Sequence, residues 1–121
     1  MLTNFQREKV KSLGIPENKI KLKPNGMSVY KNSTDKPKQG YIYVGRLEES
    51  KGVFLLLEAW NQLDDRYILT IVGDGDIISD LKTKYDADNI VFKGKCSRKD
   101  TLTYISQSKY LIQPSLLYET F

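Results

Sequence analysis

The chain has 121 residues, of which 40% are hydrophobic and 28% are charged, as in an ordinary globular domain. Its net charge of +4 favours anionic ligands or an anionic membrane surface as partners. A single cysteine excludes an intrachain disulfide, and the lack of histidine excludes imidazole catalysis and histidine metal ligands within the chain. No apolar run approaches the roughly 20 residues that span a bilayer, and no signal peptide is visible.

The first forty residues predict a leading helix, a short strand and a polar loop. Thr3 and Gln6 have the spacing of the N-cap and N3 residues of a capping box. Gly14, followed by an apolar residue and a proline, marks the end of this helix. Residues 19–23 alternate between charged and apolar and predict the strand, whereas residues 31–40 are all polar, glycine or proline and predict the loop.

From Tyr41 onward, strand patterns alternate with helix patterns. Apolar runs predict strands at 41–44, 67–72, 90–92 and 110–112, and apolar residues at helical spacing predict helices at 53–63, at 77–85 and after the Ser97-Arg98-Lys99-Asp100 capping box. This alternation with short loops predicts right-handed β-α-β units. We therefore predict an α/β fold, with a Rossmann-like parallel sheet flanked by helices, as one partial domain over residues 1–121 with its β-α-β-α-β-α-β core at 41–121.

In open parallel sheets, ligands bind beyond the carboxyl ends of the strands. These ends are expected at Gly45-Arg46, Gly73-Asp74-Gly75, Gly94-Lys95-Cys96 and Pro114-Ser115. Arg46 and Lys51 together place positive charge there, and a guanidinium group suits a phosphate well. The alternative is that both cations simply pair with Glu48 and Glu49, and the residues alone leave both interpretations open.

The turn Gly73-Asp74-Gly75-Asp76 is similar to the start of a dinucleotide-binding fingerprint. Ile78 stands where the third glycine would be, so a nicotinamide cofactor is only weakly supported. A tight turn with aspartates near a helix N-terminus is sufficient to explain Asp74 and Asp76. The glycines nevertheless allow a ligand to lie close to the backbone.

Two later segments are candidates for ligand contacts. Backbone N–H groups of Gly94-Lys95-Cys96 can read a base edge, or can belong to an ordinary turn; no histidine is present to activate Cys96 as a nucleophile. The Glu119 carboxylate can accept hydrogen bonds from sugar hydroxyls, or can be a solvated surface group. Four of the eight tyrosines fall in predicted strands, where tyrosine is favoured. No basic–aromatic stripe emerges, which disfavours a single-strand nucleic-acid binder.

The motifs follow one another as they do in a known family. Tyr43-Val44-Gly45-Arg46-Leu47, Lys51-Gly52, Ile71-Val72-Gly73-Asp74-Gly75, Asn89-Ile90-Val91-Phe92-Lys93-Gly94 and the residues from Pro114 to Phe121 resemble, in order, the nucleotide-binding domain of family 4 (group 1) glycosyltransferases. The resemblance implies the GT-B architecture of two facing Rossmann-like domains. The chain looks like the C-terminal, donor-binding domain, truncated at its end.

This resemblance implies a retaining, hexosyltransferase-type enzyme that needs no cofactor and no bound metal. The family transfers a sugar from a nucleotide sugar, here a UDP- or GDP-sugar, to a glycan or lipid-linked acceptor. It implies a role in polysaccharide or lipopolysaccharide biosynthesis and a cytoplasmic location, with peripheral contact at the inner face of the membrane. The acceptor would be bound by an N-terminal domain outside the chain.

The resemblance also implies roles for particular residues. Arg46 and Lys51 match the pair that holds the donor diphosphate and stabilises the leaving nucleotide, and Glu119 matches a glutamate that contacts the donor sugar. These three form the implied catalytic set. The implied donor-binding set adds Gly45, Gly73, Asp74, Gly75, Gly94, Lys95, Cys96, Ser115, Thr120 and Phe121.

The match to the family is incomplete, because the second glutamate of the family motif would fall beyond Phe121. The chain alone is therefore expected to bind donor weakly, to be inactive, and to self-associate through uncovered sheet edges. Two other functions stay open: a nucleotide-binding module without transferase activity, and an NAD-dependent oxidoreductase domain.

Overall fold

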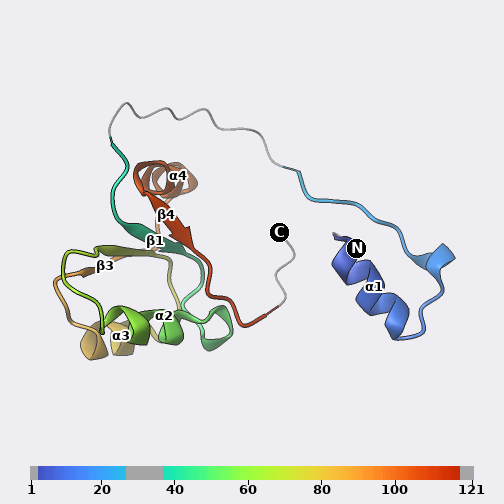
Figure 1. Ribbon diagram of the computed structural model, residues 1–121, viewed down its shortest axis with the longest axis horizontal. Helices are drawn as coiled ribbons and strands as arrows, with labels where there is room; N and C mark the ends of the chain where they lie inside the picture. Colours follow the sequence, from blue (N-terminus) through green and yellow to red (C-terminus); the bar gives the residue numbers. More distant parts are fainter. Residues whose placement is uncertain (1–2, 27–36, 118–121) are drawn as a thin grey trace. The chain divides into compact units, whose positions relative to one another are not determined.

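The structure is a computed structural model that describes residues 3–26 and 37–117. These residues belong to two compact units, one in the first part of the chain and one in the rest. Figure 1 shows the helices and strands of each unit.

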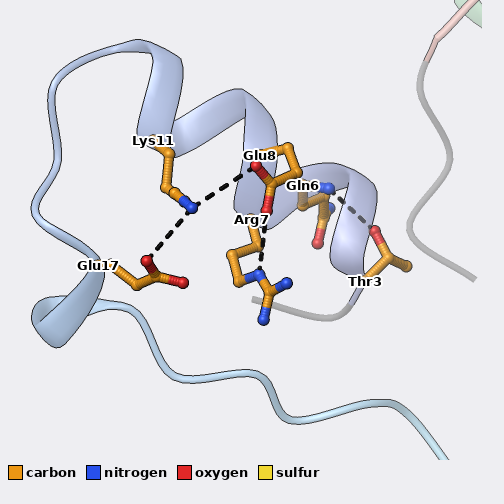
Figure 2. A network of polar contacts seen from close by, with 6 residues as sticks. All are labelled: Thr3, Gln6, Arg7, Glu8, Lys11 and Glu17. Atoms are coloured by element: carbon orange, nitrogen blue, oxygen red, sulfur yellow. Dashed lines mark hydrogen bonds and ion pairs between the residues drawn. The ribbon is translucent and has the colours of Figure 1, made fainter.

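The first unit is built on helix α1 (Asn4–Ser12), which is followed by the 3₁₀ helix η1 (Glu17–Lys19). The Thr3 hydroxyl accepts a hydrogen bond of 3.1 Å from the Gln6 backbone N–H, so the predicted N-cap is confirmed. Figure 2 shows the Lys11 ammonium between two carboxylates, those of Glu8 at 3.7 Å and Glu17 at 3.3 Å. No residue of α1 is buried.

The short strand predicted at residues 19–23 is wrong. Lys19 ends η1, and residues 20–26 have no regular secondary structure. Alternation alone makes no strand, because the backbone groups of a strand need a neighbouring strand to bond to. None of the described residues pairs with this segment.

The second unit holds a four-stranded parallel sheet, which confirms the predicted fold class. The strands are β1 (Tyr41–Val44), β2 (Leu69–Val72), β3 (Ile90–Gly94) and β4 (Tyr110–Ile112), in the spatial order β3-β2-β1-β4. All three pairs are parallel. Their carboxyl ends therefore meet at one edge, where ligands bind in such sheets.

Helices cover both faces of this sheet. Figure 1 shows α2 (Val53–Trp60) and α3 (Ile78–Lys84) on one side and α4 (Arg98–Gln107) on the other. The 3₁₀ helix η2 (Glu49–Lys51) leads into α2. The core lies between the sheet and helices α2 and α3, and its fully buried side chains include Tyr43, Leu57 and Leu81.

The predicted ranges of α2 and β2 run too far, in each case because a turn intervenes. Helix α2 ends at Trp60 instead of Leu63, whose N–H bonds the Trp60 carbonyl in a turn and whose side chain is exposed. Strand β2 begins at Leu69 instead of Tyr67, whose N–H bonds the Asp64 carbonyl. Periodicity indicates the apolar stretch well and its ends poorly.

Candidate functional site

The turn after β1 is held by three hydrogen bonds. The Gly45 N–H donates to the Val72 carbonyl at 3.1 Å, and the Leu47 N–H donates to the Asp74 carbonyl at 2.9 Å. The hydroxyl of buried Tyr43 donates to the Arg46 carbonyl at 2.8 Å. Arg46 therefore follows the strand on a fixed piece of backbone.

The turns after β1 and β2 touch backbone to backbone. Gly73 has φ of 146°, and a Cβ there would collide with the Gly45 carbonyl oxygen. A Cβ on Gly75 would collide with the carbonyl oxygen of Leu47. These glycines thus have a packing reason to be glycines, beside the ligand reason that the sequence suggests.

The turn after β1 is also joined to the segment after β4. The Leu116 N–H donates to the Ser50 carbonyl at 3.1 Å. Gly52 has φ of 70°, and a Cβ there would collide with the Pro114 carbonyl oxygen. The sheet therefore brings Lys51 near the segment that holds Ser115, although about 60 residues separate them in sequence.

A cleft of about 530 Å³ opens at this edge of the sheet, a size typical of small-molecule sites. Its lining comes from the ends of β1, β2 and β3 and the start of α4: Val44, Gly45, Arg46, Val72, Gly73, Asp74, Gly75, Asp76, Lys95, Cys96 and Thr101. A second hollow of about 560 Å³, which reaches Glu48, Glu49 and Phe54, shares Arg46 and the turn after β2 with the cleft.

The cleft brings together most of the predicted site residues that the structure describes. Lys51, Gly94 and Ser115 do not line it. Gly94 still bounds the turn after β2, because its carbonyl accepts a 2.9 Å hydrogen bond from the Gly73 N–H. Glu119, Thr120 and Phe121 lie outside the described residues.

Arg46 makes the ion pair that was the alternative to ligand binding. Its Nη2 lies 3.2 Å from Oε1 of Glu48, which also accepts a 2.6 Å hydrogen bond from the Ser50 hydroxyl. The Arg46 side chain is 75% exposed, and such surface pairs contribute only ~0.2–1 kcal/mol. A ligand with two phosphate groups competes easily against so weak a pair.

Thr101 also lines the cleft, although it is not among the site residues predicted from the sequence. Ser97 caps α4: its hydroxyl oxygen accepts from the Asp100 N–H at 3.1 Å, and its O–H donates to the Asp100 carboxylate at 2.7 Å. This cap sets the direction of the first turn, which places Thr101 at the cleft. The predicted cap, read together with the strand end before it, was the available signal.

Cys96 and the aspartates at the cleft are the residues to consider as metal ligands. Cys96 Sγ lies 3.7 Å from the Gly94 carbonyl oxygen. Within residues 3–26 and 37–117, no group of three or more His, Cys, Asp or Glu side chains is arranged to hold a metal ion. The prediction that the reaction needs no metal stays a prediction.

Comparison with known proteins places the chain in a family. Residues 29–121 match the family described as glycosyl transferases group 1. The chain belongs to this family.

Similar proteins support the same fold. A protein from Klebsiella pneumoniae, described as an uncharacterized 41.2 kDa protein in the cps region, is 29% identical over an alignment of 115 residues, gaps included; the match covers 84% of the chain and 32% of that protein. The apo form of the lipopolysaccharide outer core galactosyltransferase WaaB has a TM-score of 0.74 at 20% identity, over 98% of the chain and 36% of WaaB. A mutant of S. aureus TarM, in complex with fondaparinux, α-GlcNAc-glycerol and UDP, has a TM-score of 0.76 at 20% identity, over 94% of the chain and 24% of TarM.

The chain thus spans a quarter to about a third of the length of these proteins. The fold of the chain matches a Rossmann-like part of these GT-B glycosyltransferases. None of the helices within the described residues is long and apolar enough to cross a membrane.

Proposed function

We propose that the chain is the donor-binding part of a retaining, metal-independent family 4 glycosyltransferase. The observation that carries this proposal is the cleft at the carboxyl edge of the sheet, where Arg46, Lys95 and the glycine turn after β2 meet. Two cations beside closely approaching backbone suit a nucleoside diphosphate. Membership of the glycosyltransferase family supports the other half of the proposal, which is that the sugar attached to the diphosphate is transferred.

In this proposal the positive charge performs the electrostatic step. The guanidinium of Arg46 and the ammonium of Lys51 hold the diphosphate, and they stabilise the charge that develops on it as the glycosidic bond breaks. The Glu48 carboxylate leaves Arg46 when donor binds. The backbone of Gly94–Cys96 contacts the base, while Ser115, Glu119, Thr120 and Phe121 contact the sugar and phosphates.

The proposed substrates draw on the relatives. The TarM structure is a complex with UDP and α-GlcNAc-glycerol, and WaaB is described as a galactosyltransferase of the lipopolysaccharide outer core. We propose a UDP-hexose as the donor, with a GDP-sugar as the alternative, and a surface polysaccharide or lipid-linked saccharide as the acceptor. We further propose that acceptor binding requires a second domain and that the protein works at the cytoplasmic face of the membrane.

Saturation-transfer NMR with UDP, GDP and NADH tests this function. We expect UDP or GDP to bind, and an Arg46→Ala/Lys51→Ala double variant to lose the binding. An Arg66→Ala/Lys82→Ala variant removes the same charges outside the cleft and should bind as the unaltered chain does.

Each result separates the candidate functions. Binding of NADH alone would replace the proposal with an oxidoreductase. Nucleotide binding that both double variants retain would remove Arg46 and Lys51 from the site. Nucleotide binding by a full-length protein that transfers no labelled hexose would leave a binding module without transferase activity.

A further inference from the structure

Tyr43 is a buried residue whose polar end reaches the candidate site. Its side chain is 1% exposed and belongs to the core cluster with Leu57 and Trp60. Its hydroxyl donates a 2.8 Å hydrogen bond to the Arg46 carbonyl. A phenylalanine would fill the same apolar space, so this hydrogen bond is what the hydroxyl adds.

The peptide group between Arg46 and Leu47 is hydrogen-bonded on both sides. Its carbonyl accepts the hydrogen bond from Tyr43, and its N–H donates to the Asp74 carbonyl at 2.9 Å. Because a peptide group is planar and rigid, two bonds on opposite sides fix its orientation. One residue earlier, the Gly45 N–H is bonded to the Val72 carbonyl at 3.1 Å.

Arg46 therefore leaves the backbone from a point that is fixed on both sides. Its side chain is long and exposed, and its bond to Glu48 is of the weak surface type. A defined backbone origin reduces the conformations that the guanidinium must lose when it binds an anion. The close packing of Gly45 on Tyr43 adds to this, since a Cβ on Gly45 would lie 2.8 Å from the Tyr43 hydroxyl oxygen.

We propose that Tyr43 is a positioning residue, which orients Arg46 for the donor diphosphate from within the hydrophobic core. This inference rests on the proposed function, because it assumes that Arg46 binds the diphosphate. Tyr43 is not among the residues that line the cleft. Its effect on binding must therefore pass through Arg46 and must depend on the phosphates.

The test measures dissociation constants of UDP and of uridine by NMR titration for four proteins: the unaltered chain, Tyr43→Phe, Arg46→Ala and the double variant. We expect Tyr43→Phe to weaken UDP binding about three- to tenfold, the range for loss of one hydrogen bond, and to leave uridine binding unchanged. In the Arg46→Ala background, Tyr43→Phe should have no further effect. Tyr41→Phe, at the other end of the same strand, is the matched control and should bind UDP normally.

Three results would overturn the role of Tyr43 and leave the proposed function standing. The first is that Tyr43→Phe binds UDP with unchanged affinity while Arg46→Ala loses UDP binding. The others are that Tyr43→Phe weakens the binding of UDP and of uridine equally, or that the effects of the two substitutions are fully additive in the double variant. If Arg46→Ala keeps its affinity for UDP, the proposed function of Arg46 fails first. Hydrogen exchange of the unaltered chain gives a reading that needs no variant. The Leu47 amide should be protected before UDP is added, and exchange that slows only with UDP would contradict a turn fixed in advance.

Discussion

At the scale of single residues, Arg46 is the one on which the contacts of the site converge. The Tyr43 hydroxyl donates to its carbonyl, the Glu48 carboxylate pairs with its guanidinium, and Arg46 is one of the residues that line the cleft. The pair with Glu48 is a competitor of any anion that binds there. Ser50 holds this competitor in place through the 2.6 Å hydrogen bond to the Glu48 carboxylate.

We predict that Glu48→Gln strengthens UDP binding about two- to fivefold, because it removes an exposed ion pair worth ~0.2–1 kcal/mol and a negative charge beside the diphosphate. Calorimetric titration measures the affinity. Glu58→Gln is the matched control. Glu58 makes a similar exposed ion pair, 3.5 Å from the Lys84 ammonium, and neither residue lines the cleft. Weaker binding in Glu48→Gln would mean instead that Glu48 orients Arg46.

At the scale of elements, the site depends on loops that pack against each other without side chains between them. The turn after β1 meets the turn after β2 through Gly73 and Gly75, and it meets the segment after β4 through Gly52. A ligand cleft formed this way is shaped by backbone spacing. Space for a Cβ, as well as φ, then decides which glycines can be replaced.

Gly52 and Gly94 separate these two effects, because their φ angles are 70° and 69° but only Gly52 has an atom, the Pro114 carbonyl oxygen, in the place of a Cβ. We predict that Gly94→Ala lowers the free energy of unfolding by ~1–2 kcal/mol, the cost of a left-handed alanine. Gly52→Ala should lower it by a further ~1–3 kcal/mol from overpacking. Urea denaturation measures both variants, and equal losses would refute the close approach.

At the scale of the whole molecule, the net positive charge and the hydrophobic core belong to different parts of the chain. Residues 1–26 carry six Lys and Arg against two Glu, which equals the +4 of the complete chain, so residues 27–121 have no net charge. Among the residues that the structure describes, the buried cluster and the hydrophobics packed on it lie between Tyr41 and Ile112. The net positive charge therefore comes from residues 1–26, whereas the buried core comes from the segment that forms the sheet.

We predict that removing residues 1–26 changes the Tm of the sheet by less than about 4 °C, equivalent to less than ~1 kcal/mol, and abolishes retention on a cation exchanger at pH 7. Circular dichroism follows the melting. As a control, Leu81→Ala in the shortened chain should cost ~2–5 kcal/mol, because Leu81 is fully buried. A shortened chain that melts without cooperativity would contradict the prediction.

Sequence patterns predicted the sheet well, because buried strands such as Tyr41–Val44 are continuous apolar runs and the Ser97 cap is a local signal. They failed at residues 19–23, where forming a strand depends on a distant partner. They left the pair of Arg46 with Glu48 open and missed the Tyr43 hydrogen bond, because both contacts depend on side-chain direction in three dimensions. The roles of the predicted site residues stay predictions until binding is measured.

The order of the strands in space has a consequence for how the chain reaches its native state. β1 lies between β2 and β4, and Tyr41 pairs both with Leu69 and with Tyr110, which is 69 residues away in sequence. Such distant pairing is slow, because the entropy of closing a long loop is lost before the contacts between the strands form. β1, β2 and β3 can assemble first, so docking of β4 is expected to be the late step of folding. During synthesis on the ribosome, one side of β1 stays open until Tyr110–Ile112 has emerged, which leaves that side of the nascent sheet exposed to mispairing until β4 docks.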